Sequence, residues 1–133
     1  WNLVDNKELC YCYLGDFDKA MIKTIKSEKN FNKTPVQEIW HNDGDQVLAY
    51  MRGDLLFVFN FSPTRSFTDY GFLVSTGAYS IVLDTDNKEF GGNGLNDDSM
   101  THLTTYDPLY VGDRKEWLKL YLPARSALVL KKN

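Results

Sequence analysis

The acidic stretch at residues 84–89 is the part of the chain whose residue types first suggest chemistry. It reads Asp84-Thr85-Asp86-Asn87-Lys88-Glu89, and oxygen ligands at alternate positions are what a calcium loop supplies. Lys88 occupies the third alternate position, and no glycine follows at the sixth position. The complete calcium loop is therefore absent, and the pattern favours a solvated turn without a metal site.

The glycine-rich stretch FGGNG at residues 90–94 lacks the G-x-G-x-x-G spacing of a phosphate-binding loop. No helix pattern follows it, so we interpret it as a tight loop that needs positive φ angles. A G-x-S-x-G motif is missing, and His102 stands in a threonine-rich loop, where a histidine is usually a surface residue. The acids cluster in turns and not as a carboxylate pair in a cleft. The sequence thus predicts no catalytic residue in this chain.

Four aromatic residues on strand or loop segments are the remaining candidates for binding. Flat rings with polar rims suit the faces of sugars. Trp40, Tyr106, Tyr110 and Trp117 are therefore candidate carbohydrate-binding residues. For each ring, ordinary packing in a core or an interface is the more common role.

The charge balance excludes several classes of partner. The 133 residues include 15 basic and 18 acidic side chains, a net charge of -3. The longest basic cluster, Lys19, Lys23, Lys26 and Lys29, is typical of a solvated helix face, so nucleic-acid binding is not predicted. No apolar run approaches membrane-spanning length, which predicts no membrane partner. No residue pattern indicates a cofactor.

The two cysteines, Cys10 and Cys12, lie two positions apart and point in different directions on a helix or a strand. They cannot readily form a bridge, and free thiols indicate a reducing compartment, so we expect the cytoplasm. The chain begins at Trp1 and not at a methionine. We therefore expect a processed product or a fragment of a longer protein.

Residues 47–62 give the strongest structural signal. Two apolar runs, 47–51 and 55–61, flank a turn at Gly53-Asp54, which is typical of a β-hairpin. The second run is apolar except for Asn60, so we predict a strand buried on both faces, with Asn60 in a structural role.

Further strands are predicted at 36–41, 67–74, 78–83, 117–122 and 126–130. The fold class that follows is mainly β, an antiparallel β-sandwich of about seven strands preceded by one or two short helices. Residues 84–110 show little periodicity and are predicted to be one long excursion.

The first 30 residues show an apolar period of three to four that is interrupted at Gly15-Asp16. This predicts two short helices, one starting at a capping box of Asp5 and Glu8 and one capped by Asp16. A polar linker ending at Pro35 places a domain boundary between residues 1–34 and 35–133.

Several motifs, taken in order, resemble a known family. GDLLFVFNFSPT with SFTDY, then IVLDTDNKEFGGNG and LYLPARSALVL, resemble the C-terminal β domain of 1,4-α-glucan (glycogen) branching enzymes of the α-amylase superfamily. The leading WNLVDNKELCYCYLGDFDKAM resembles the last helical segment of that family's (β/α)8 catalytic barrel. The resemblance covers nearly the whole chain.

The resemblance implies a non-catalytic C-terminal part of an enzyme that cleaves α-1,4-glucan and reattaches the piece through an α-1,6 linkage in glycogen biosynthesis. The Asp nucleophile and Glu acid/base of such enzymes lie in the barrel, which is expected upstream of Trp1, so the chain alone is expected to be inactive. The implied partners are the catalytic barrel of the same polypeptide and an α-glucan. The apolar helix face of Tyr13, Phe17 and Met21 is suited to packing on that barrel. In the chain alone we expect this face to fold back on the sandwich or to promote self-association.

Residues 91–98 depart from the family's G-G-H-x-R-x-D-H pattern, because only the glycines and Asp97 are kept. Contacts made by the missing cationic groups are therefore not implied here. Two alternative functions stay open on the residues alone. One is a stand-alone carbohydrate-binding β-sandwich module, and the other is an adaptor that binds protein through a strand edge.

Overall fold

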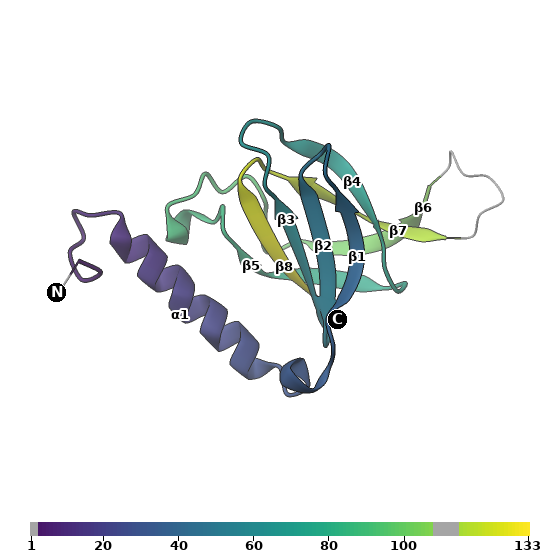
Figure 1. The fold of residues 1–133 in the computed structure, drawn as a ribbon, viewed down its shortest axis with the longest axis horizontal. Helices are drawn as coiled ribbons and strands as arrows, with labels where there is room; N and C mark the ends of the chain where they lie inside the picture. Colours follow the sequence, from purple (N-terminus) through teal and green to yellow (C-terminus); the bar gives the residue numbers. More distant parts are fainter. Residues whose placement is uncertain (1–2, 108–114) are drawn as a thin grey trace.

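The structure, a computed structural model, describes residues 3–107 and 115–133 and consists of antiparallel strands with one long helix lying outside them (Figure 1). The elements in order are α1 (Tyr11–Ser27), η1 (Phe31–Lys33), β1 (Gln37–Asn42), β2 (Val47–Arg52), β3 (Leu55–Asn60), β4 (Phe67–Leu73), β5 (Ala78–Asp84), η2 (Lys88–Phe90), β6 (Thr101–Tyr106), β7 (Glu116–Leu122) and β8 (Ser126–Lys132). No helix within these described residues is long and apolar enough to cross a membrane.

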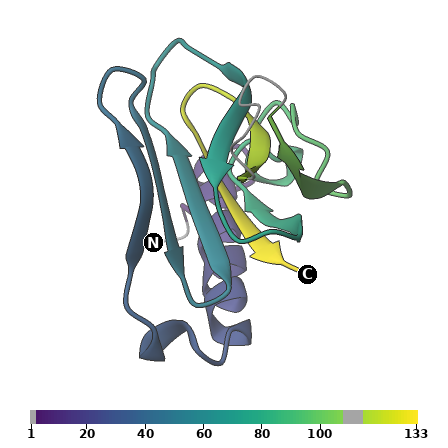
Figure 2. The ribbon, with the colours of Figure 1, turned by 90° about the vertical axis from the view of Figure 1, so that its right-hand side faces the viewer.

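The strands of the described residues follow the order β1-β2-β3-β8-β5-β6-β7-β4. The sheet curls round on itself, as the side view in Figure 2 shows, and its two outermost strands approach each other. The indole Nε1 of Trp40 on β1 donates to the hydroxyl of Tyr70 on β4 at 3.1 Å, and that hydroxyl donates to Asp45 at 2.9 Å. The predicted antiparallel β-sandwich is confirmed.

One hydrophobic core fills the space between the inner faces of the curled sheet. Its members come from six strands and are at most 7% exposed: Val47, Ala49, Leu56, Val58, Phe72, Tyr79, Ile81, Leu118, Leu120, Leu122, Leu128 and Leu130. A second, smaller cluster lies on the outer face, where Leu55, Leu83 and Val129 are covered by Phe17, Ala20 and Met21 of α1 and by Phe31, Phe57 and Phe90. Strand β3 therefore contributes to both clusters, as the run at 55–61 predicted.

Asn60 is the buried polar residue at the end of β3, and it joins three segments. Its amide nitrogen donates to the carbonyl oxygens of Arg65, Leu122 and Pro123 at 2.8, 3.2 and 3.0 Å, and its amide oxygen accepts from the backbone N–H of Ser62 at 3.0 Å. The side chain is 2% exposed and satisfied on both sides. The structural role predicted for Asn60 is confirmed.

The prediction of two short helices, with caps at Asp5 and Asp16, was wrong in detail. A single helix, α1, runs through Gly15-Asp16, and residues 3–5 and 7–8 are turns. A Cβ at Gly15 would lie 2.4 Å from the Cγ1 of Val4, so glycine leaves room for the N-terminal turn to pack against the helix. Because a single glycine costs a helix interior only about 1 kcal/mol, packing outweighs the local break.

The predicted excursion at 84–110 also contains a strand that the sequence did not indicate. Strand β6 pairs with β5 and with β7, which raises the number of strands in the described residues from about seven to eight. Its residues alternate between exposed and half-buried, without a buried apolar position. The period-two signal was missing because neither face of β6 belongs to the core.

Candidate functional site

Four aromatic rings form a row on the outer face of β2 and β3, and we call them the aromatic ladder: Tyr50, Phe57, Phe59 and Phe61. Tyr50 stacks on Phe57 and on Phe59 with ring centroids 4.9 and 5.9 Å apart, and Phe59 stacks on Phe61 at 5.4 Å. The rings are within 4 to 19° of parallel. Neighbouring rings therefore cover each other's faces and present mainly edges to the outside.

A groove lies between the ladder and the N-terminal half of α1. Two hollows of about 320 and 400 Å³ meet at Thr85; the first is lined by Phe59, Phe61 and Ala127, the second by Tyr13, Leu14 and Phe17 among others. Leu14 is 66% exposed and Phe61 is 59% exposed. We call this groove, with the ladder, the outer apolar surface. Such contiguous apolar exposure is typical of a surface that contacts another protein segment.

Helix α1 is held against the β structure near its middle and just beyond its C-terminus. Near its middle, Phe17 meets Phe90 edge to face at 5.3 Å. Beyond its C-terminus, the carboxylate of Glu28 pairs with the Nζ of Lys131 at 2.6 Å, and the guanidinium of Arg52 lies over the Phe31 ring at 4.5 Å. The face of Phe17 and Met21 thus folds back on the sandwich, one of the two expected outcomes, whereas Tyr13 stays 42% exposed.

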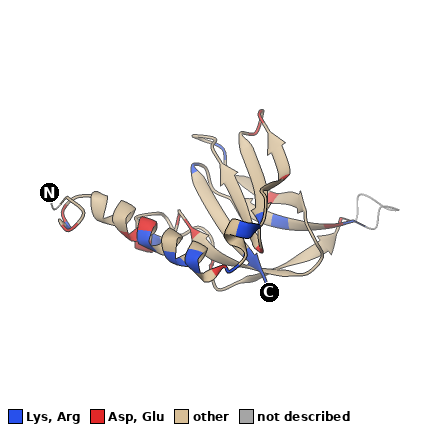
Figure 3. Ribbon diagram, turned by 60° about the horizontal axis from the view of Figure 1, so that its bottom comes forward, with Lys and Arg blue, Asp and Glu red and all other residues tan. Residues whose placement is uncertain are grey.

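The basic side chains of α1 point away from this packing. Lys19, Lys23 and Lys26 are exposed along the helix, where Figure 3 shows them interspersed with acidic residues. Lys19 pairs with Asp16 at 3.6 Å, and both side chains are largely solvated. The interpretation of this cluster as a solvated helix face is confirmed.

The described members of the predicted carbohydrate-binding set do not form one platform. Trp40 is 43% exposed and bonded to Tyr70, as described above. Trp117 is half-buried on β7 and packs over Gly71, whose Cβ position would lie 3.5 Å from the indole. Since side chains of successive residues on a strand point to opposite faces, the contacts at Tyr70 and Gly71 place Trp40 and Trp117 on opposite faces of β4.

Tyr106 ends β6 and is 60% exposed. It pairs with Glu116, the neighbour of Trp117, so it too points away from the Trp117 ring. Tyr110 lies outside the described residues. The sugar-binding role of these four rings stays a prediction, and the aromatic ladder is the cluster that sequence reasoning missed. Its signal was present in the alternation of Phe57, Phe59 and Phe61.

The acidic stretch at 84–89 is not the solvated turn that the sequence predicted. Asp84 is 1% exposed and Asp86 is 9% exposed. The Asp86 carboxylate accepts from the backbone N–H groups of Asn93 and Leu95, both at 3.0 Å, and Asp84 accepts from the N–H of Asp86 at 2.7 Å. The carboxylates therefore hold the loop in place of a ligand. Within the described ranges, no group of three or more His, Cys, Asp or Glu side chains is placed to hold a metal ion.

The glycine-rich loop wraps tightly around this anchor. Gly91 and Gly94 have φ angles of 78 and 66°, as predicted. A Cβ at Gly92 would lie 2.1 Å from the carbonyl oxygen of Asp86. Glycine is therefore needed here for turn geometry and close approach, not for phosphate.

Burial changes the acid–base behaviour of two residues in this region. Loss of solvent raises the pKa of Asp84 to about 6, and the nearby charge of Asp98 adds to the rise. His102 is half-buried on β6, contrary to the predicted surface position, and burial lowers its pKa. Neither group faces a nucleophile, so the pKa shifts reflect packing.

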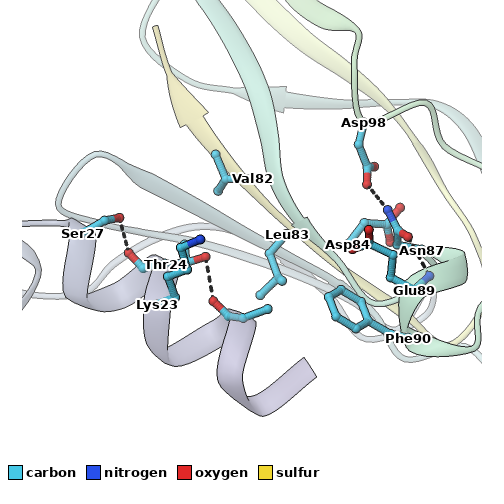
Figure 4. A pocket seen from close by; sticks show the side chains of 11 residues that line it. Lys23, Thr24, Ser27, Val82, Leu83, Asp84, Asn87, Glu89, Phe90 and Asp98 are labelled. Atoms are coloured by element: carbon cyan, nitrogen blue, oxygen red, sulfur yellow. Dashed lines mark hydrogen bonds between the residues drawn. The ribbon is translucent and has the colours of Figure 1, made fainter. Parts of the chain in front are cut away.

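A polar cleft of about 340 Å³ separates α1 from this loop (Figure 4). Several of its hydrogen-bonding groups are occupied by internal contacts. The hydroxyl of Thr24 donates to Ala20 and that of Ser27 to Thr24, while the Asn87 amide bonds both Asp98 and the N–H of Glu89. Within the described residues, the buried Oδ1 of Asp98 has no hydrogen-bond partner, and the side chains of Lys23 and Glu89 form no hydrogen bond. We call this cleft the seam between the helix and the loop.

Comparison with protein families identifies the β part of the chain. Residues 39–133 match the family described as "Alpha amylase, C-terminal all-beta domain". The matched residues begin within β1 and run to the last residue, so they include every described strand.

Curated relatives extend the similarity to the whole chain. Over 131 residues, 97% of this chain, it is 43% identical to the 1,4-alpha-glucan-branching enzyme of Emericella nidulans. The enzymes of the same name from Eremothecium gossypii and Saccharomyces cerevisiae are 40% and 39% identical over 100% and 98% of the chain. The chain spans only about a fifth of their length, 18 to 19%. The resemblance stated from the motifs is confirmed.

Proposed function

The chain belongs to the family of alpha-amylase C-terminal all-beta domains, and from this premise we propose that it is the non-catalytic C-terminal domain of a 1,4-α-glucan-branching enzyme. The observation that carries the proposal is its identity of about 40% to enzymes of that name over essentially its whole length. In this proposal the parent protein transfers α-1,4-glucan segments to form α-1,6 branches. The reacting carboxylates then belong to a catalytic barrel and not to this domain.

The outer apolar surface is the natural place for that barrel to dock. Its apolar components are exposed on the outside of an otherwise closed β structure, with Leu14 on one side of the groove and Phe61 on the other. The stacked ladder offers ring edges, which suit close packing by another protein surface more than stacking by a sugar. The proposed partner is the catalytic part of the same polypeptide, and residues 1–34 carry the chain from that barrel into the β domain.

The proposed location is the cytoplasm. Cys10 is exposed, Cys12 is half-buried, and both carry free thiols. Free thiols near the surface persist in a reducing compartment, where glucan for storage would be branched.

Two proteins test the proposal: the chain alone and the product of the complete open reading frame that encodes it. We expect only the latter to shift the iodine-stained spectrum of amylose, because the proposal assigns the reacting carboxylates to the barrel. A spectral shift caused by the chain alone would contradict the proposal. So would a complete product that leaves amylose unchanged.

The docking role is tested by a matched pair of substitutions in the complete protein. Leu14→Asp places a charge in the groove, whereas Leu103→Asp places it at a similarly exposed position on β6 (66% and 63% exposed). We expect Leu14→Asp to lower the thermal midpoint and the branching rate, since it buries a charge at the interface. Leu103→Asp should leave both near the parent value. Equal effects of the two substitutions would show that the groove is not part of the interface with the barrel.

A further inference from the structure

The ladder ends in a ring whose outer side borders a second, polar cleft. Phe61 follows the last residue of β3. It lines a cleft of about 590 Å³, whose other walls are β1, β2 and the turn between them. The polar residues of this cleft are Glu38, His41, Asn42, Asp43 and Gln46. Leu48 adds to the apolar side.

The position of Phe61 at the end of the row distinguishes it from the other three rings. Tyr50 and Phe59 each have two stacking neighbours, and Phe57 packs against Tyr50 and Phe31, while Phe61 stacks on Phe59 alone, at 4° from parallel. Phe61 is 59% exposed, and within the described residues no aromatic ring covers its second face. An open aromatic face is what the C–H groups of a pyranose ring pack against.

The rim of this cleft has side chains with hydrogen-bonding groups that are free. Within the described part of the chain, the side chains of Asp43 and Gln46 make no hydrogen bond, and the Asn42 side chain uses only its oxygen, which accepts from the N–H of Asp45 at 2.9 Å. The backbone carbonyl of Gln46 accepts from the N–H of Phe61 at 2.9 Å, which fixes the rim relative to the ring. Gln46 has a φ of 59°, so the turn itself is held in an uncommon conformation.

The charges of the rim select against anions. Glu38 and Asp43 are acidic, and the Glu38 carboxylate already contacts His41 Nδ1 at 2.7 Å. Carboxylate and amide groups bind neutral hydroxyl groups well, but the carboxylates repel a phosphorylated sugar. A flat apolar face with free carboxylate and amide groups around it matches a neutral, polyhydroxylated ring.

We infer that this cleft binds one glucosyl residue of an α-1,4-glucan chain, with the sugar stacked on Phe61 and its hydroxyls bonded to Asp43, Asn42 and Gln46. The choice of α-glucan over other neutral sugars rests on the proposed function. The site lies at the far end of the ladder from the Phe31–Phe57 contact, and among the described residues Phe61 is the one that lines both this cleft and the groove along α1. It would hold a glucan chain on the C-terminal domain at a distance from the reacting carboxylates.

The test is titration of the 133-residue chain with maltoheptaose, followed by NMR of backbone amides and by calorimetry. We expect shifts confined to residues around Gln46 and Phe61. Phe61→Leu keeps an apolar side chain but removes the flat face, and it should weaken binding by about 10-fold. Gln46→Ala should weaken binding by about 5-fold through a lost hydrogen bond.

Tyr11→Leu is the matched control, because Tyr11 is 54% exposed and lies at the start of α1, outside this cleft. Its binding should equal that of the parent chain. Shifts centred on Trp40, Tyr106 or Trp117, an unchanged affinity of Phe61→Leu, or no binding would each overturn the inference. Equal affinity for cellohexaose would overturn the choice of α-glucan. None of these results bears on the amylose assay, so failure here is distinguishable from failure of the proposed function.

Discussion

The two faces of strand β3 have different compositions and different neighbours. The inner face carries Leu56 and Val58, which are 0 and 1% exposed and belong to the core enclosed by the curled sheet. The outer face carries Leu55, which is fully buried in the cluster that α1 covers, and Phe57 and Phe59, which are only half-buried. The inner face is thus fully buried within the domain, whereas the outer face keeps exposed aromatic surface that another molecule or protein segment can contact.

The difference shows how stability and recognition are separated in this domain. The inner face is close-packed, so any loss of volume there leaves a cavity. The outer face bears half-exposed rings, so substitutions of these rings are expected to cost less. Four substitutions, ordered from the largest expected effect to the smallest, would sharpen or break this comparison.

Truncation of the inner face has the largest expected effect. Leu56→Ala should destabilise the chain by about 4 kcal/mol, because a fully buried leucine leaves a cavity that the sheet cannot close. Phe59→Leu on the outer face should cost about 1 kcal/mol or less. Urea unfolding followed by circular dichroism measures both. Similar losses would mean that the outer face is as tightly packed as the inner one.

Asn60→Ala tests the polar end of the inner face. The substitution removes the donors to three carbonyl oxygens and the acceptor for Ser62, so a loss of about 3 kcal/mol is expected. Amide hydrogen exchange should speed up at Ser62 in particular. An unchanged urea midpoint would show that water replaces the side chain without cost.

Asp84 on β5 lies opposite the core residue Leu128 of β8 in the strand register. Its titration therefore measures the free-energy cost of a charge on the inner side of the sheet. Its pKa is raised from 3.8 to about 6, so the folded chain keeps a proton that the unfolded chain releases. This contribution to stability is complete below about pH 4 and is lost as the pH rises through about 6, a change of about 3 kcal/mol.

The variant Asp84→Asn should remove that pH dependence, so it should exceed the parent in stability at pH 8 and not at pH 4. Asp54→Asn, at an exposed turn position, makes the same change in charge and serves as the control. Urea midpoints at the two pH values measure the effect. A parent chain that becomes more stable between pH 4 and pH 8, relative to Asp84→Asn, would contradict the burial argument.

Loosening of the helix has the smallest expected effect. Phe17→Ala removes the edge-to-face contact with Phe90 and part of the cover of Leu83, and it should cost about 1 to 2 kcal/mol. Leu14→Ala, on the exposed side of the same helix, should cost less than about 0.5 kcal/mol. Trypsin cleavage at the lysines of α1 should become faster in Phe17→Ala alone. Equal cleavage rates would show that α1 is not held by this contact.

The sequence by itself determined the strands whose side chains alternate and the role of Asn60. The runs at 47–51 and 55–61 correspond to β2 and β3 within a residue, because period-two alternation is a local property that burial of one face imposes. The same locality explains the motif resemblance, since the hairpin and the last strand pair are continuous segments. It also explains the misplaced caps in α1, where tertiary packing of Val4 against Gly15 outweighs a local break.

Only the tertiary structure decided what lies outside the core. The residue pattern around Asp84 and Asp86 predicts a solvated turn. In the structure, residues 93–95 lie over this turn, and the backbone N–H groups of Asn93 and Leu95 donate to Asp86. Strand β6 has no core face and forms because β5 and β7 stand on either side of it. Likewise, the ladder needs Tyr50 from one strand between Phe57 and Phe59 of the next. These features depend on contacts between distant segments, and local residue patterns do not carry that information.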